Sequence, residues 1–119
     1  MIDIGLLMRF GAKTTLHLPN EVIFNPNGHD GFLYQVVAGA VKLITRNHEG
    51  HEFVHRIYGD GQCFGVLMPE FQAASSAIAL ETTSLIRLPN ERFSELLREH
   101  GRFAEMGYLN AKRLQGGDG

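Results

Sequence analysis

Three histidines lie close together along the chain, at His48, His51 and His55. Neutral imidazole is the commonest metal ligand, so their spacing raises the question of a metal site. On an extended strand, His51 and His55 would lie about 13 Å apart at ~3.3 Å per residue, which is too far to share one ion. His48 falls in a turn between two apolar segments. The spacing therefore favours solvated surface histidines, and we expect no metal site.

The single cysteine, Cys63, excludes an internal disulfide and a four-thiolate metal cluster. A reactive thiol needs a nearby cation or imidazole to lower its pKa, and no such residue lies within several positions. A small buried strand residue is therefore the favoured interpretation. No nucleophile with a matching base can be identified, and no glycine-rich loop follows a phosphate-binding pattern. We expect no catalytic residue and no cofactor.

The elements that carry these residues alternate between apolar and polar side chains, with a turn signal between each pair. Turns rich in proline, asparagine and glycine fall at 19–20, 25–28, 47–50 and 59–61. Strands are expected at 14–18, 21–24, 32–38, 40–46, 53–58, 63–64, 75–79 and 84–88. Many short strands at short, regular spacing are typical of a β-sandwich or barrel.

Helical spacing is found only at the two ends. A short helix is expected within residues 1–10, with Ile4, Leu7 and Met8 on one face. Asn90 is expected to cap a helix that continues to residue 100. A second helix, with a flexible tail after it, completes the expected order.

The composition suits one soluble domain. The chain has 119 residues and a formal net charge of −2, so no overall field attracts nucleic acid. The longest uncharged run, residues 31–41, is far shorter than the ~20 residues that span a bilayer. The early Asp3 and the lack of a basic segment do not fit a signal peptide. We expect a cytoplasmic protein with no membrane contact.

Six strings along the chain occur in a specific order. They are Glu21–Phe24 with Gly28 after it, Leu33–Leu43, Glu49–Phe53, Gly61–Gly65, Ala79–Glu81 and Leu85–Leu88. Together they resemble the sensor domain of the CRP/FNR transcription regulators and, more broadly, the cyclic nucleotide-binding domains. The resemblance implies a mainly β fold, a double-stranded β-helix or cupin-like jelly roll, with a short N-terminal helix and two C-terminal helices. It implies one domain over residues 1–119, with the roll at 13–89, the C-terminal helices at 90–114 and the tail at 115–119.

The resemblance fails in the segment that holds the ligand in the family. There, a glutamate accepts a hydrogen bond from the ribose and an arginine pairs with the cyclic phosphate. Val66 and Ala73 stand at these two positions, and no Arg or Lys lies between Arg56 and Arg87. We therefore expect a degenerate pocket that takes a neutral or apolar ligand, or is closed. Its expected lining is Gln62, Phe64, Gly65, Val66, Leu67, Ala73, Ala74, Ser75 and Ser76.

The resemblance implies a ligand-sensing, regulatory domain of a CRP/FNR-like regulator, without its DNA-binding domain, and no enzyme. Its expected partner is a small-molecule effector of unknown identity. We expect no direct DNA binding by this chain, and weak self-association through Phe103, Met106, Leu109 and Leu114. One alternative is a non-sensing dimerisation or interaction scaffold. Another is a cupin-like metal enzyme, which the lack of closely paired histidines with a following glutamate disfavours.

Overall fold

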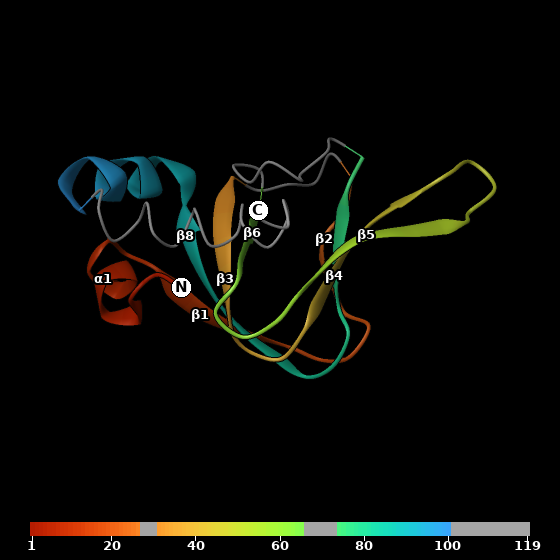
Figure 1. The fold of residues 1–119 in the computed structure, drawn as a ribbon, viewed down its shortest axis with the longest axis horizontal. Helices are drawn as coiled ribbons and strands as arrows, with labels where there is room; N and C mark the ends of the chain where they lie inside the picture. Colours follow the sequence, from red (N-terminus) through yellow and green to blue (C-terminus); the bar gives the residue numbers. More distant parts are fainter. Residues whose placement is uncertain (27–30, 66–73, 101–119) are drawn as a thin grey trace, which may run out of the picture.

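The computed structural model describes residues 1–26, 31–65 and 74–100. Its eight strands form two four-stranded antiparallel sheets that face each other, as Figure 1 shows. Along the chain, the elements are α1 (Ile4–Arg9), β1 (Lys13–His17), β2 (Val22–Phe24), β3 (Phe32–Ala38), β4 (Val41–Arg46), β5 (Glu52–Tyr58), β6 (Cys63–Gly65), β7 (Ser76–Ala79) and β8 (Thr83–Pro89), followed by helical residues 90–100. All eight predicted strands are present, with ends within one residue of those expected.

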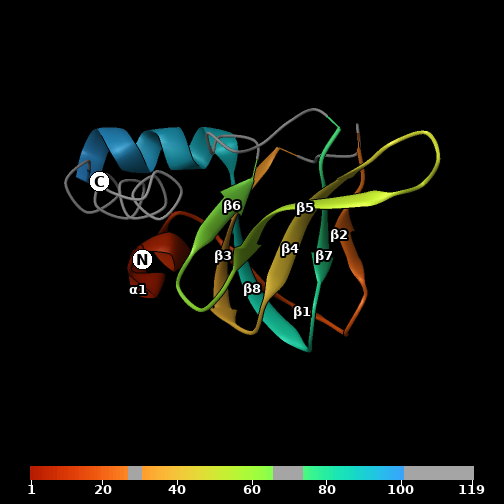
Figure 2. The same cartoon turned by 45° about the vertical axis from the view of Figure 1, so that its right-hand side comes forward.

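The strand order is β1-β8-β3-β6 in one sheet and β2-β7-β4-β5 in the other. Consecutive strands therefore often lie in opposite sheets, as in a jelly roll, and the predicted mainly β roll is confirmed. The β4–β5 hairpin extends beyond the roll, and both helical segments lie on the outer side of the β1-β8-β3-β6 sheet (Figure 2). The second predicted C-terminal helix and the tail lie outside the described residues.

Strand alternation divides the buried side chains into two cores. On β8, Leu85 faces the space between the sheets, whereas Ile86 and Leu88 face the helical side. Successive residues of a strand point to opposite faces, so this one strand serves both cores. The core between the sheets contains Phe24, Tyr34, Val36, Val41, Leu43, Tyr58, Phe64, Ala77 and Leu85.

The N-terminal helix is positioned by polar contacts at its start. The carboxylate of Asp3 caps α1 by accepting a hydrogen bond from the Leu6 amide at 2.9 Å. Ahead of the helix, the buried Gln35 side chain binds the Ile2 backbone, accepting from its amide at 2.9 Å and donating to its carbonyl at 2.8 Å. The expected buried face is wrong in part, because Met8 is exposed. Leu7 is buried as expected, and Leu6 is buried in place of Met8, because that side of the helix packs on the core.

The capping role predicted for Asn90 is also wrong. Asn90 is itself helical, and its side-chain oxygen is buried without a hydrogen-bond partner. Strand β8 runs directly into the helix at Pro89, so no free turn places Asn90 ahead of the first helical residue. Within the described part of the chain, no helix has the length and apolar character needed to cross a membrane.

Gly39 lies where β3 turns into β4, with a φ of +122°. A side chain there would meet Thr83, because a Cβ atom would lie 2.7 Å from the Thr83 Cα. The Thr83 hydroxyl accepts a hydrogen bond from the Ala40 amide at 3.2 Å and lies 2.8 Å from the Glu81 carbonyl, to which it can donate. The close approach of the two sheets at this turn therefore depends on the missing side chain.

Candidate functional site

Two rows of directly paired residues cross the sheets, one row in each sheet. In one sheet, the strand register aligns Lys13, Arg87, Tyr34 and Phe64. In the other, it aligns Phe24, Ala77, Leu43 and Arg56. These rows lie near the ends of β2, β6 and β8 and the beginnings of β3 and β7. We call them the mouth layer.

Both arginines of the mouth layer face the interior. Directly paired residues of antiparallel strands project from the same face of a sheet. Tyr34, the partner of Arg87, and Leu43, the partner of Arg56, both belong to the core between the sheets. The two guanidinium groups therefore approach this core from opposite sheets.

Aromatic rings fill the space between the two rows. Phe64 is fully buried and stacks on Tyr34 at 5.0 Å and on Tyr58 at 5.1 Å between ring centroids. Phe24 lies 6.1 Å from Tyr34 and 6.4 Å from Phe64. Because Phe24 and Tyr58 come from one sheet and Tyr34 and Phe64 from the other, the stack joins the two sheets across the roll.

Each arginine lies against a ring of this stack or next to it, since Phe32 lies 6.3 Å from Tyr34 between ring centroids. The Arg87 guanidinium carbon is 4.4 Å from the Phe32 centroid, and that of Arg56 is 5.6 Å from the Tyr58 centroid. Such cation–π contacts stabilise by about 0.5–2 kcal/mol, depending on how much water is excluded. No carboxylate among the described residues forms a salt bridge with either guanidinium.

One nitrogen of each guanidinium is left without a hydrogen bond. Nε of Arg87 and Nη1 of Arg56 are buried, and neither has a hydrogen-bond partner. An unsatisfied buried donor costs about 1–3 kcal/mol, and more when the group is charged. Arginine stays protonated in proteins, so it cannot reduce this cost by losing its charge. Each of these half-buried arginines therefore keeps one buried donor without a hydrogen bond.

The sequence-based interpretation missed these two residues, because it looked for a cation only in the ligand-holding segment. Strand alternation was the available signal, since Arg87 is two residues from the inward Leu85 and Arg56 is two residues from the inward Tyr58. The expected lining without a cation concerns residues 62–76 and stays a prediction. The cations come from β5 and β8.

The predicted lining residues are only partly brought together. Phe64 and Gly65 end β6, and Ser75 is buried just ahead of β7. A Cβ atom on Gly65 would lie 2.7 Å from the Phe32 carbonyl oxygen, which explains a glycine there. Val66, Leu67 and Ala73 lie outside the described residues.

Three other predicted lining residues are placed away from the mouth layer. Gln62 closes the turn after β5, where its Oε1 accepts a hydrogen bond from the Gly59 amide at 2.8 Å. Ser76 is next to Ala77, whose side chain faces the core between the sheets. Because successive strand residues point to opposite faces, the Ser76 side chain points away from that core. Ala74 is exposed.

Cys63 is buried on β6, and the prediction of a buried strand residue is confirmed. Its thiol donates to Oε1 of Gln35 at 3.2 Å. Burial raises the pKa of Cys63 to about 12, because the thiolate would lose its hydration. The thiol therefore stays protonated at neutral pH and is a poor nucleophile.

The histidines of the β4–β5 hairpin have local polar partners. His55 hydrogen-bonds the Thr45 hydroxyl at 2.7 Å, and His51 lies 3.6 Å from the Glu49 carboxylate at the exposed tip. Across residues 1–26, 31–65 and 74–100, no group of three or more His, Cys, Asp or Glu side chains is arranged to hold a metal ion.

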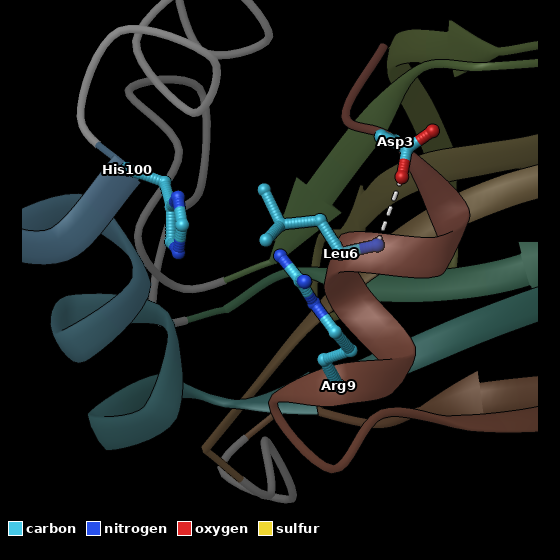
Figure 3. Close-up of a pocket in the computed structure, with 4 residues that line it drawn as sticks. All are labelled: Asp3, Leu6, Arg9 and His100. Carbon is cyan, nitrogen blue, oxygen red and sulfur yellow. Dashed lines mark hydrogen bonds between the residues drawn. The ribbon is translucent and has the colours of Figure 1, made fainter.

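A small pocket of about 270 Å³ lies on the helical side of the protein. Asp3, Leu6, Arg9 and His100 line it, as Figure 3 shows, and the sequence analysis singled out none of them as a site. The Asp3 carboxylate is already engaged in capping α1, and the His100 ring packs edge-on against Phe10 at 5.8 Å. Both side chains thus have structural partners.

Comparisons with known proteins agree with the architecture. Residues 17–100 match the family of cyclic nucleotide-binding domains. The cyclic AMP receptor protein of Thermus thermophilus is 34% identical over 89 residues, which are 72% of this chain and 41% of that protein. The crystal structure of the Thermus thermophilus catabolite activator protein superposes with a TM-score of 0.74 at 28% identity, covering 94% of this chain and 54% of that one.

A different kind of protein also carries a similar segment. The lysophospholipase NTE1 of Pyricularia oryzae is 30% identical over 82 residues, which are 67% of this chain and 6% of that protein. Such a match concerns one module of a much longer protein. The chain likewise spans about two fifths of the receptor protein that it resembles, as the 41% coverage indicates.

Proposed function

The chain belongs to the cyclic nucleotide-binding domain family, in its CRP/FNR branch, and from this membership we propose that it is an effector-sensing regulatory domain that does not hold cyclic AMP or cyclic GMP in the usual way. Similarity to regulators over the whole roll supports the regulatory role. We further propose that it serves a transcription regulator and does not itself read DNA.

The observation that carries this proposal is the pair of residues in the ligand-holding segment. The family resemblance implies a glutamate and an arginine where this chain has Val66 and Ala73. Each lost hydrogen bond to a charged group removes about 1.5–3 kcal/mol of net stabilisation. Losing both corresponds to an affinity reduced by at least about a hundredfold, at 1.4 kcal/mol per factor of ten.

The filled interior supports the same conclusion. The ring of Phe64 is stacked between Tyr34 and Tyr58 and has no exposed surface. A bulky ligand entering the core at this level would have to separate these rings. The proposed lining of the effector site is therefore Phe64, Gly65 and Ser75, together with Val66, Leu67 and Ala73 in the segment between β6 and β7.

Isothermal titration calorimetry on the unmodified chain tests the proposal. Cyclic AMP and cyclic GMP are expected to bind no tighter than the high micromolar range. The double variant Val66→Glu/Ala73→Arg is expected to recover binding poorly, because the family resemblance implies a segment longer by a couple of residues. A sub-micromolar dissociation constant for either nucleotide on the unmodified chain would refute the proposal.

A second candidate function, an interaction scaffold, has one observation in its favour. Strand β5 is an edge strand, and Phe53, Val54 and Ile57 on it are each more than half exposed. Exposed apolar side chains on an unpaired edge are typical of a docking surface. A thermal-shift screen separates the candidates, since a sensor is stabilised by a small molecule and a scaffold is not. Stabilisation by a divalent metal would instead support the cupin-like enzyme.

A further inference from the structure

We propose that Thr15, His17 and Glu21 form an acyl-accepting site, in which the Thr15 hydroxyl attacks an activated acyl ester while His17 removes its proton. Two hydrogen bonds join the side chains, because the Thr15 hydroxyl lies 2.9 Å from Nε2 of His17, and Nδ1 of His17 lies 2.6 Å from a Glu21 carboxylate oxygen. A hydroxyl, an imidazole and a carboxylate linked in this order are the recurring parts of an activated nucleophile. The inference goes beyond the proposed sensing function and does not depend on it.

The end of β1 and the turn after it bring the three side chains together. Thr15 and His17 are two residues apart on the strand, so their side chains lie on the same face. The chain then turns, with a φ of +70° at Asn20, and the Glu21 amide donates to the Leu18 carbonyl at 3.0 Å. This turn returns the Glu21 side chain to the imidazole. Spacing along the chain does not show the contact, which is why no nucleophile with a matching base was expected.

The carboxylate determines which ring nitrogen of His17 carries the proton. An ionised carboxylate only accepts hydrogen bonds, so Nδ1 of His17 donates to Glu21. Nε2 of the neutral ring then carries the lone pair, and the Thr15 hydroxyl donates to it. The Leu18 amide donates to Oε1 of Glu21 at 3.1 Å, and this hydrogen bond, followed by the one from His17, lowers the pKa of the Glu21 carboxyl. The imidazole is therefore oriented as a base toward the hydroxyl.

The site lies at an open edge of the roll. Strand β1 is at the end of its sheet and has only β8 hydrogen-bonded beside it. The side chain of His17 is 14% exposed and that of Glu21 is 43% exposed, whereas Thr15 is partly buried. Partial burial of the imidazole reduces the competition of water for its two hydrogen bonds. The exposed part of Thr15 leaves the hydroxyl open to a small reagent.

The chemical step is an acyl transfer. Oγ1 of Thr15 forms a bond to the acyl carbon, and the bond between that carbon and the leaving oxygen breaks. The hydroxyl proton moves to Nε2 of His17 and from there to the leaving group, so the products are an acylated Thr15 and a free alcohol or phenol. The proposal includes no donors for the negatively charged oxygen of the intermediate, and we therefore expect slow, stoichiometric acylation rather than turnover.

The chain contains a natural control on the β4–β5 hairpin. The Thr45 hydroxyl lies 2.7 Å from Nε2 of His55, which reproduces the contact between hydroxyl and imidazole. No carboxylate of the described residues forms an ion pair with His55. The difference in reactivity between Thr15 and Thr45 therefore reports the effect of the third residue.

An alkyl fluorophosphonate tests the site on the full, unmodified chain. Attack by a threonine hydroxyl forms an oxygen–phosphorus bond and releases fluoride, and mass spectrometry of peptides gives the labelling rate at each position. Thr15 is expected to be labelled at least about tenfold faster than Thr45. The acyl donor p-nitrophenyl acetate is expected to leave an acetyl ester on Thr15 with the same preference.

Three variants test the roles of the hydroxyl and the base. His17→Gln removes the base and keeps a hydrogen-bonding side chain, so labelling of Thr15 should slow at least about a hundredfold. Thr15→Ser keeps the hydroxyl and should still be labelled. His55→Gln is the matched control, because it removes the other imidazole that contacts a threonine, and it should leave labelling of Thr15 within about twofold.

Glu21 is a positioning residue, because it acts on the hydroxyl only through His17. Glu21→Gln should slow labelling at least about tenfold, and Glu21→Asp should retain more of the rate. The nitrogen chemical shifts of the His17 ring give a readout that a merely structural role would not move. They should show the tautomer protonated at Nδ1 in the parent and a mixture of tautomers in Glu21→Gln.

The inference is overturned if Thr15 is not labelled, if Thr45 reacts as fast, or if labelling of Thr15 continues at the parental rate in His17→Gln or Glu21→Gln. The comparison of Thr15 with Thr45 is made within one chain, so it does not depend on any variant folding. Binding of an effector by a chain whose Thr15 is inert would overturn this inference and leave the proposed sensing function intact.

Discussion

Replacement of Gly39 by alanine should destabilise the roll more than any other single methyl addition at its turns. Gly39 has a φ of +122°, and an added Cβ would lie 2.7 Å from the Thr83 Cα, a backbone atom that cannot rotate away. The backbone conformation alone costs a non-glycine residue about 1–3 kcal/mol. Forcing the two turns apart costs about 1–3 kcal/mol more. We therefore expect Gly39→Ala to lower the free energy of unfolding by about 2–6 kcal/mol.

Gly50→Ala is the matched control. Gly50 also has a positive φ, +88°, but a Cβ there would meet nothing within 4 Å. The Gly50→Ala substitution should lower the free energy of unfolding only by the cost of a positive φ in alanine, about 1–2 kcal/mol. Urea unfolding followed by far-ultraviolet circular dichroism gives both free energies. If both substitutions lower the free energy of unfolding equally, the added methyl group at Gly39 causes no destabilising clash with Thr83, and the steric argument is refuted.

Four further predictions concern the core, the thiol, the C-terminal segment and nucleic acid. Phe64→Ala should lower the free energy of unfolding by about 3–5 kcal/mol in the same urea assay, because it empties the centre of the aromatic stack; a loss below about 1 kcal/mol would contradict the packing. The pKa of Cys63 is raised from 9.0 to about 12 in the folded state, so between these pH values only the thiol of the unfolded chain ionises. The free energy of unfolding should therefore fall as pH rises from about 9 toward 12, by up to about 1.4 kcal/mol per pH unit. Cys63→Ala should remove that part of the decline, and an unchanged pH profile would contradict it. The predicted second C-terminal helix carries Phe103, Met106, Leu109 and Leu114, and sedimentation should show a monomer that forms a dimer only at high concentration. A tight dimer that the Leu109→Glu substitution leaves unaffected would argue against this helix. This chain alone should not bind DNA specifically, given its net charge of −2, and a sequence-selective mobility shift at physiological salt would show otherwise.

The succession of strands along the chain could be predicted because its signals are local. The turns at 47–50 and 59–61 contain residues that adopt turn conformations at low cost, and alternation between them marks each strand. Cys63 could be interpreted correctly for the same reason, since the absence of a nearby cation is visible in the sequence. The helix ends were less predictable. Asn90 has a capping side chain, but β8 continues directly into the helix, and this junction is a property of the packed chain.

The candidate site shows where local reasoning ends. Strand alternation in the sequence puts Arg56 on one face with Tyr58 and Arg87 on one face with Leu85. The sequence also shows Val66 and Ala73 where the family resemblance implies charged residues. That both strand faces point into the same core became clear only from the fold. Pairing between strands depends on contacts between residues far apart in the chain, such as Tyr34 with Arg87, and a shift of one residue would turn every side chain of a strand to the other face.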